Sequence, residues 1–315
     1  MTNVLVTGGA GFIGSHLVEA LVARGYRTRV LDNLATGHLE NLSGVAKDVE
    51  FVRTDLRDFD AVCAAVRGVE LVYHEAALPS VSRSVQNPRD SNEANVTGTL
   101  NLLTAARDAG VRRVIMAASS SVYGKNEALP KEESMPPAPL SPYAVSKAAG
   151  EMYMRVFAEL YGIETVCLRY FNVFGPRQDP TTQYAGAIAK FMSCALRGEP
   201  YPVFGDGEQS RDFTYVANVV EANLLAAAAP IDRHALVNIA CGERASLNRV
   251  IQILNELTGR RLPVKYLPAR AGDVRHSLAS IDRARALLGY RPQIGLREGL
   301  EKTFEWYRAQ AGSDG

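Results

Sequence analysis

The chain has 315 residues, of which 47% are hydrophobic and 22% are charged. This composition is typical of globular proteins, and the length fits one large α/β unit or two closely joined domains. The net charge of +1 gives no overall field that would gather nucleic acid or an anionic membrane. The longest apolar run, 222–231, is too short to span a bilayer, and the first residues lack a secretory signal, so we expect a cytoplasmic protein. The four cysteines form no Cys-x-x-Cys pair, so we expect neither a metal site nor a disulfide framework.

The first half of the chain alternates short β-branched runs with amphipathic stretches. We predict strands at 4–7, 28–31, 49–52, 70–73, 114–117 and 164–169. Apolar residues three and four apart predict helices at 15–24, 95–109 and 146–160. This alternation indicates an α/β fold with a doubly wound parallel (Rossmann) sheet, whose ligands bind beyond the carboxyl ends of the strands.

The pattern changes after about Gly175, where Gly and Pro become frequent and the regular alternation is lost. We therefore predict a nucleotide-binding domain over 1–175 and a smaller substrate domain over most of 176–315. A short apolar run within 236–240 looks like one more strand, which would return to the first sheet.

A glycine-rich loop follows the first strand and precedes a helix, with Gly8, Gly11 and Gly14 spaced three apart. Glycines let the backbone approach a pyrophosphate closely, and a helix N-terminus supplies unpaired N–H groups to it. Asp32 ends the second strand about 20 residues further on, where a carboxylate can accept the hydroxyls of an adenosine ribose. Asn33 follows, and no Arg stands beside it to receive a 2′-phosphate, so the sequence favours NAD over NADP.

A second constellation could carry acid–base chemistry. Tyr143 and Lys147 lie four apart at the start of a predicted helix, so both side chains lie on one face. A nearby ammonium group lowers the pKa of a phenol and makes it usable as a base near neutral pH. Ser119, Ser120 and Ser121 follow the strand at 114–117, at the edge of the sheet where the ligand is expected.

These motifs together resemble the nucleotide-sugar epimerases of the extended short-chain dehydrogenase/reductase superfamily. The resemblance extends through nearly the whole chain in family order, with matching elements at 7–14, 32–33, 55–56, 74–77, 119–124, 143–147, 169–175 and 211–213. It implies NAD as cofactor and a UDP-sugar as substrate.

The resemblance also implies roles for individual residues. Ser119, Tyr143 and Lys147 would form the catalytic triad, with Tyr143 taking the proton of the sugar O4 as hydride leaves C4 for the nicotinamide. Besides the loop, Asp32, Asn33 and the Tyr143–Lys147 pair, the cofactor-binding residues would be Phe12, Ile13, Asp55, Leu56, Ala76, Ala77, Asn95 and Tyr170. For Asp55, a helix N-cap is an equal alternative. The substrate-binding residues would be Ser82, Ser120, Ser121, Asn172, Arg211, Arg270, Asp273 and Ser277.

The set of possible reactions is narrowed by the acidic residues that this chain lacks. Relatives that dehydrate nucleotide sugars carry Asp and Glu where this chain has Ser120 and Ser121, and hydroxyls are poor substitutes for an acid and a base. Decarboxylating relatives keep a Glu at the position of Ser121. C4 epimerisation, through a transient 4-keto intermediate, needs only the O4 proton shuttle and a reversible hydride.

Ser277 bears on the choice of sugar. Family members restricted to glucose-type sugars carry a bulky side chain at this position, and those that accept N-acetylated sugars carry a small one. We therefore expect UDP-GlcNAc and UDP-GalNAc to be the favoured pair, and turnover of UDP-glucose and UDP-galactose stays open because a roomy pocket often admits a smaller ligand.

Two rival interpretations remain at this stage. A UDP-uronate 4-epimerase or decarboxylase would need a basic side chain facing C6, for which Arg83 is the candidate, and Arg275 has no assigned role. A non-catalytic NAD(H)-sensing module would keep the glycine loop but need no base. The helices at 95–109 and 146–160 resemble the pair through which relatives form a homodimer, although their apolar stripes could equally belong to the core.

Overall fold

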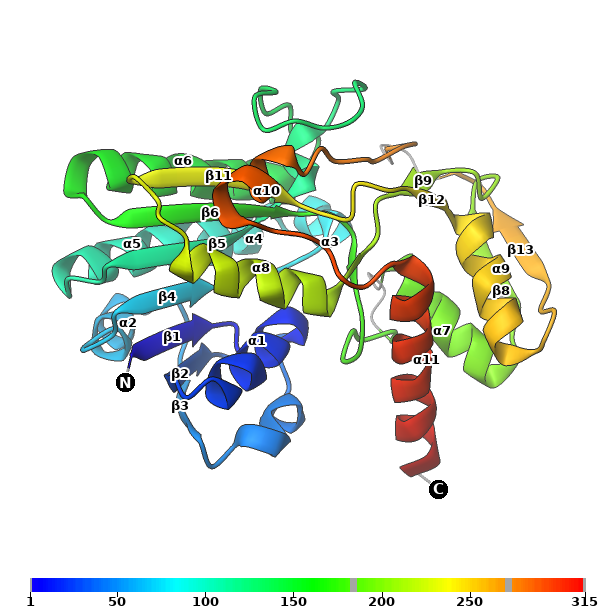
Figure 1. Ribbon diagram of the computed structural model, residues 1–315, viewed down its shortest axis with the longest axis horizontal. Helices are drawn as coiled ribbons and strands as arrows, with labels where there is room; N and C mark the ends of the chain where they lie inside the picture. Colours follow the sequence, from blue (N-terminus) through cyan, green and yellow to red (C-terminus); the bar gives the residue numbers. More distant parts are fainter. Residues whose placement is uncertain (1, 182–185, 270–273, 314–315) are drawn as a thin grey trace.

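A parallel sheet of seven strands forms the centre of the computed structural model, which describes residues 2–181, 186–269 and 274–313 (Figure 1). In spatial order the strands are β11 (His234–Ile239), β6 (Glu164–Tyr170), β5 (Arg113–Ser119), β4 (Leu71–His74), β1 (Asn3–Thr7), β2 (Arg27–Asp32) and β3 (Val49–Arg53). All neighbouring pairs are parallel. The predicted α/β fold with a Rossmann-like sheet is therefore confirmed.

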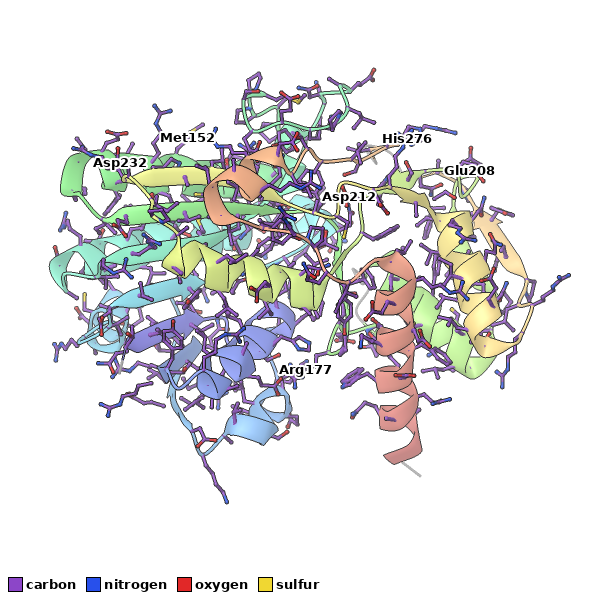
Figure 2. All side chains as sticks on the ribbon, in the orientation of Figure 1. Met152, Arg177, Glu208, Asp212, Asp232 and His276 are labelled. Carbon is purple, nitrogen blue, oxygen red and sulfur yellow. The ribbon has the colours of Figure 1, made fainter. Side chains whose placement is uncertain are left out.

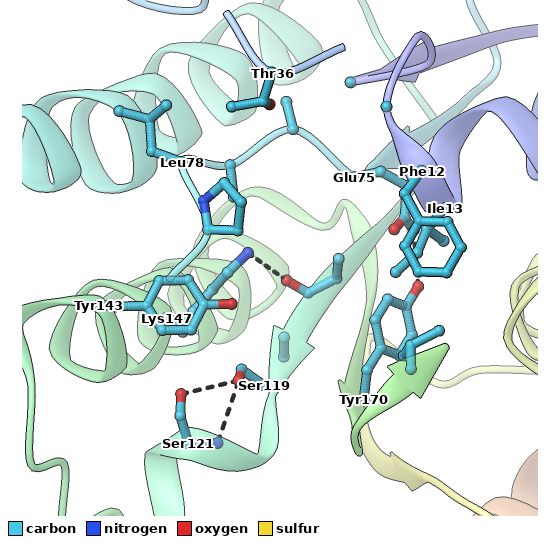
Figure 3. Close-up of a pocket in the computed structure, with 18 of the residues that line it drawn as sticks. Phe12, Ile13, Thr36, Glu75, Leu78, Ser119, Ser121, Tyr143, Lys147 and Tyr170 are labelled. Carbon is cyan, nitrogen blue, oxygen red and sulfur yellow. Dashed lines mark hydrogen bonds between the residues drawn. The ribbon is translucent and has the colours of Figure 1, made fainter. Parts of the chain in front are cut away.

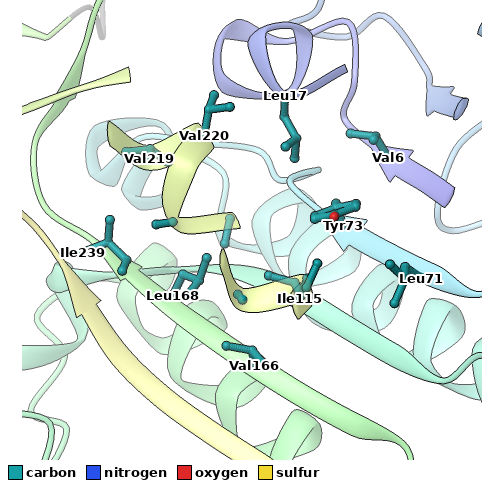
Figure 4. Packing of buried hydrophobic residues seen from close by; sticks show 14 of the residues in the cluster. Val6, Leu17, Leu71, Tyr73, Ile115, Val166, Leu168, Val219, Val220 and Ile239 are labelled. Carbon is teal, nitrogen blue, oxygen red and sulfur yellow. The ribbon is translucent and has the colours of Figure 1, made fainter. Parts of the chain in front are cut away.

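Helices cover both faces of this sheet, and alternate residues of each strand serve the two faces. Val4 and Val6 of β1 pack with one face, while Leu5 packs with the other. The first face holds α1 (Phe12–Ala23), α8 (Val216–Ala228) and α10 (Asp282–Leu288), and Figure 4 shows Leu17 and Val219 meeting the strand side chains there. The second face holds α2 (Phe59–Ala65), α5 (Gly98–Asp108) and α6 (Pro142–Tyr161). Burial on both faces explains why the strands read as nearly continuous apolar runs.

A second lobe with its own apolar core lies beside the carboxyl ends of the strands (Figure 1). It contains α7 (Ala187–Arg197), α9 (Leu247–Thr258), α11 (Leu296–Ser313) and the paired strands β8 (Tyr201–Phe204) and β13 (Val264–Leu267). Two further short ladders lie outside the seven-stranded sheet: β7 (Val173–Phe174) with β10 (Thr214–Tyr215), and β9 (Ser210–Arg211) with β12 (Ala245–Ser246).

The second half of the chain contributes two helices to the sheet in addition to the predicted strand. The run within 236–240 is part of β11, which pairs with β6, but α8 and α10 also pack on the sheet. The division at residue 175 into a nucleotide-binding domain and a substrate domain stays a prediction.

Short helical segments make up the remaining connections. They are η1 (Leu39–Val45), α3 (Val81–Gln86), α4 (Pro88–Asn92), the π-helical η2 (Glu93–Thr97) and the 3₁₀ turn η3 (Ser120–Tyr123). The helix predicted at 95–109 is thus divided between η2 and α5. Within the described parts of the chain, no helix is both long enough and apolar enough to cross a membrane.

Candidate active site

A cavity of about 610 Å³ lies at the carboxyl ends of the sheet strands, between the sheet and the second lobe. Most of the residues that the sequence assigns to a site line it: Gly8, Gly11, Phe12, Ile13, Gly14, Asp32, Asn33, Asp55, Leu56, Ala76, Ala77, Ser119, Ser120, Ser121, Tyr143, Lys147, Tyr170, Asn172, Arg211 and Ser277. The position agrees with the rule that parallel sheets bind their ligands beyond the strand ends.

The glycine loop between β1 and α1 is too tight for larger residues. Gly8 has φ +69°, and a Cβ atom there would come within 2.7 Å of the Ala76 backbone. A Cβ on Gly14 would lie 2.2 Å from the carbonyl oxygen of Gly8. The first turn of α1 therefore packs directly against the loop, and its N-terminal N–H groups lie at the cavity, as a pyrophosphate site requires. The cradle fits a dinucleotide.

The carboxylates at the adenosine end are held by local hydrogen bonds. Asp32 accepts the N–H groups of Ala10, at 3.0 Å, and Leu34, at 2.8 Å. Burial raises the pKa of Asp32, and these two hydrogen bonds oppose that shift. The sequence therefore correctly places a carboxylate where β2 ends, and the glycine loop itself fixes its orientation.

Asp55 has partners that the sequence did not reveal. It accepts hydrogen bonds from Arg57, at 2.9 and 2.8 Å, and from the Asn33 amide, at 2.7 Å. The hydrogen bonds of Arg57 hold the pKa of Asp55 well below its usual range. The alternative of a helix cap is wrong, because the side chain that caps α2 is that of Asp58.

The three proposed catalytic residues meet in the cavity (Figure 3). Ser141 caps α6 by accepting the N–H of Ala144, and this places Tyr143 in the first turn and Lys147 one turn later. The hydroxyls of Ser119 and Ser121 are 2.9 Å apart at the end of β5.

Burial governs the electrostatics of Tyr143. It raises the pKa of Tyr143, and the hydroxyl of Ser119 lowers that pKa by less. The ammonium group of Lys147 donates to the carbonyl oxygen of Ala117, at 2.8 Å, and its lowering of the pKa of Tyr143 stays a prediction. Burial in turn lowers the pKa of Lys147 to about 8. A ligand that brings positive charge into the cavity would favour the phenolate form of Tyr143.

Glu75 also lines the cavity, and in the sequence it stands only within the matched motif at 74–77. Its carboxylate accepts a 2.7 Å hydrogen bond from the hydroxyl of Tyr170, which accepts one of the same length from Asn223 on α8. The only signal in the sequence is its position directly after β4, at the edge where ligands bind.

One end of the cavity, at Arg211 and Asn172, is organised around Asp212, which the sequence shows only as part of the matched motif at 211–213. The Asp212 carboxylate is fully buried and accepts the N–H groups of Cys241, Gly242 and Ala279, at 2.9, 3.1 and 3.3 Å. Its carbonyl oxygen accepts the side-chain amide of Asn172, at 3.2 Å. Figure 2 shows Asp212 between the sheet and the second lobe. One residue therefore connects four segments at this end of the cavity.

Arg211 and Ser277 lie next to this centre. Arg211 donates to the carbonyl oxygens of Ser210 and Arg275, at 3.0 Å each, and the N–H of Ser277 donates to the carbonyl oxygen of Ser210, also at 3.0 Å. The side chain of Arg275 forms an exposed ion pair with Asp206. These contacts fix the segment that carries Ser277 against β9.

Two predicted binding residues are placed elsewhere. Asn95 is buried and lies outside the lining of the cavity: its side chain binds both the N–H and the carbonyl oxygen of Leu78, and it also contacts Ser146. It therefore shapes the loop after β4. Ser82 is exposed on α3, because helical periodicity turns it outward while Val81 faces the cavity. Arg83 does not line the described cavity either. Arg270 and Asp273 lie outside the described residues.

Comparisons with known proteins agree with this site. The NAD dependent epimerase/dehydratase family matches residues 4–240. A putative UDP-glucose 4-epimerase of Methanocaldococcus jannaschii is 41% identical over 307 residues, which cover 97% of this chain and 98% of that protein.

Solved structures match along the whole chain. The UDP-N-acetylglucosamine 4-epimerase of Methanobrevibacter ruminantium, in complex with UDP-N-acetylmuramic acid, matches with a TM-score of 0.94 and 40% identity over 98% of this chain and 99% of that one. The UDP-glucose 4-epimerase of Thermus thermophilus, in complex with NAD, matches with a TM-score of 0.90 and 42% identity over the same shares of the two chains. The chain therefore belongs to the NAD-dependent epimerase/dehydratase family, and its cofactor is NAD.

Proposed function

We propose that this chain interconverts the C4 epimers of UDP-sugars, with UDP-GlcNAc and UDP-GalNAc as the favoured pair. The observation that carries the proposal is the placement of Ser119, Tyr143 and Lys147 in one cavity with the dinucleotide loop and the small side chain of Ser277. A non-catalytic NAD(H)-sensing module would not need these three side chains.

Tyr143 is the proposed base for the sugar O4. It would take the O4 proton as C4 becomes a ketone and return it when the hydride comes back to the opposite face. Bound NAD supplies the acceptor for that hydride and a positively charged ring. The hydroxyl of Ser119, which lines the same cavity as Tyr143, would orient O4, and Lys147 would hold the nicotinamide ribose.

The cavity offers little for the other reactions of the family. Ser120 and Ser121 line it where a dehydratase would need an acid and a base. The uronate interpretation depends on Arg83, which lies on α3 and is not among the residues that line the cavity, so the described cavity does not support it. Arg211 and Asn172 also line the cavity, and a guanidinium group suits the oxygens of a diphosphate.

The size of the side chain at position 277 supports the preference for N-acetylated sugars. Ser277 is only 9% exposed yet lines the cavity, so a larger residue there would fill space otherwise open to an acetamido group. The same space would also admit an unsubstituted hexose.

Direct incubation tests the proposal. Purified protein, without and then with added NAD, is given UDP-GlcNAc, UDP-glucose or UDP-glucuronate separately, and the 4-epimers are resolved by chromatography. Conversion of UDP-GlcNAc at the highest rate supports the proposal. Conversion of UDP-glucose alone keeps the reaction but overturns the preference, and conversion of the uronate alone restores the rival.

We also propose that a second copy of the chain packs on α6. Val145, Met152, Val156 and Leu160 form an outward apolar stripe on this helix and are 47–69% exposed. A stripe of this kind on a long helix favours association with another apolar surface. Figure 2 shows Met152 on the outward side of α6.

A further inference from the structure

Glu75 is a carboxyl group in the cofactor cavity for which the proposed chemistry has no use. It follows β4 directly and shares the cavity lining with Tyr143 and Lys147. One of its oxygens, Oε1, accepts the hydrogen bond of Tyr170. Within the described residues no other hydrogen bond reaches this carboxyl group, so its remaining lone pairs are open to the cavity that it lines.

The surroundings stabilise the charge of Glu75 only in part. Burial raises its pKa to about 7, against the hydrogen bond of Tyr170 and the positive charge of Lys147, which both lower it. A buried carboxylate is costly unless further donors or positive charge compensate it. Near neutral pH this group therefore gains from any additional cation that enters the cavity.

The other groups packed around Glu75 do not supply the additional positive charge that would compensate its carboxylate. Helix α1 contributes Phe12 and Ile13 to the same wall, and neither ionises (Figure 3). Asn223, on α8, is engaged with Tyr170. His74 precedes Glu75 on β4, and the hydroxyls of Thr7 and Thr99 hold its two ring nitrogens, while burial lowers its pKa to about 3.

We propose that the Glu75 carboxylate sets the balance between oxidised and reduced nicotinamide in this cavity by favouring the oxidised ring, which is positively charged. The inference rests on the proposed function, because the ring must lie beside Tyr143 and Lys147 to exchange hydride with the sugar. Its consequence is that the reduced cofactor readily gives the hydride back, so that a 4-keto sugar is less often released and the protein is less often left in a reduced, inactive form.

The test measures cofactor selectivity without any sugar. The full-length protein is equilibrated with known mixtures of NAD⁺ and NADH, and the bound ratio is determined from the fluorescence of the reduced nicotinamide. At pH 8, Glu75→Gln is expected to shift the bound ratio toward NADH on the order of tenfold. For a two-electron couple, tenfold corresponds to about 30 mV. At pH 6 the difference between the two proteins should shrink, because Glu75 is then largely neutral in the wild type.

Two controls separate Glu75 from its neighbours. Asp55→Asn, at the adenosine end, should change the affinities for NAD⁺ and NADH by the same factor and leave their ratio unchanged. Tyr170→Phe removes the hydrogen bond that stabilises the carboxylate, so the pH at which the bound ratio changes should move upward. Any pH response that survives in Glu75→Gln belongs to another titratable group of the lining, such as Lys147 or Tyr143.

An equal bound ratio in the wild type and Glu75→Gln at pH 8 would overturn the inference. If Glu75→Gln does not fold, an unchanged midpoint in Tyr170→Phe overturns it instead. Because no sugar is present, failure of the epimerase assay and failure of this test are distinguishable.

Discussion

The guanidinium group of Arg169 and the carboxylate of Glu151 form two parallel hydrogen bonds, of 2.8 and 2.7 Å, inside the protein. The pair joins β6 to α6, the helix that carries Tyr143 and Lys147. The guanidinium carbon also lies 4.6 Å from the centre of the Tyr123 ring. The orientation of the catalytic helix therefore depends on a charge pair that water does not reach.

Glu151→Ala should destabilise the protein by about 3–5 kcal/mol, because it leaves a buried cation without its partner. Urea unfolding measures the change. As a control, Arg285→Ala breaks the exposed pair with Asp282 and should cost less than about 1 kcal/mol. Equal decreases in the free energy of unfolding for the two variants would show that the buried pair stabilises the protein no more than the exposed pair does.

Asp212 should make stability depend on pH. Burial raises its pKa from the ordinary 3.8 to about 7, despite three backbone hydrogen bonds. Since the folded pKa is the higher one, its contribution to stability is present below about pH 4 and is lost as the pH rises to about 7. Over that window the free energy of unfolding should fall relative to that of Asp212→Asn by up to about 1.4 kcal/mol per pH unit.

Urea unfolding of both proteins at pH 5, 6 and 7 measures this difference in slope. Asp282→Asn changes an exposed carboxylate and serves as the control. Parallel pH profiles for the wild type and Asp212→Asn would contradict the prediction.

What could be predicted from the sequence was local in the chain. The strands were found within a residue or two because burial on both faces makes continuous apolar runs, and the glycine loop and the Tyr143–Lys147 spacing each lie within one turn or loop. Glu75 was missed because its partner Tyr170 is 95 residues away, and Asp212 because its contact with Ala279 spans 67 residues. Only the folded sheet brings such residues together.

Contacts distant in the chain also hold two of the predicted site residues. The side-chain amide of Asn95, in the π-helical turn, binds the backbone of Leu78, 17 residues earlier, and a contact of Asn95 with the cofactor stays a prediction. Helix spacing brings Lys147 near Tyr143, but the hydrogen bond that holds its ammonium group goes to the carbonyl of Ala117, 30 residues away on β5.

Tyr143→Phe tests the proposed base. Removing the phenol hydroxyl should lower kcat by about 10²–10⁴-fold, the usual contribution of a positioned acid–base group. Binding of NAD should change little, because the glycine loop and Asp32 are untouched. Chromatographic assay of the epimers and cofactor binding by fluorescence measure the two effects, and an active Tyr143→Phe protein would remove Tyr143 from the mechanism.

Met152→Arg tests the proposed contact between two copies of the chain. A charge in the middle of the apolar stripe on α6 should weaken association, because it would be buried without a partner. Sedimentation of the variant should show a monomer where the wild type shows a dimer. Lys302→Glu, on the exposed side of α11, is the control and should leave the oligomeric state unchanged. A monomeric wild type would contradict the proposal directly.

Ser277→Tyr tests the assignment of the sugar. A bulky ring at this lining position should fill the space for the acetamido group and lower kcat/KM for UDP-GlcNAc at least about tenfold more than for UDP-glucose. Ser277→Ala keeps a small side chain and should preserve the ratio of the two values, which separates the effect of size from loss of the hydroxyl. Measuring kcat/KM for both sugars in the three proteins decides the matter. If Ser277→Tyr lowers both values equally, the selectivity must come from another part of the cavity.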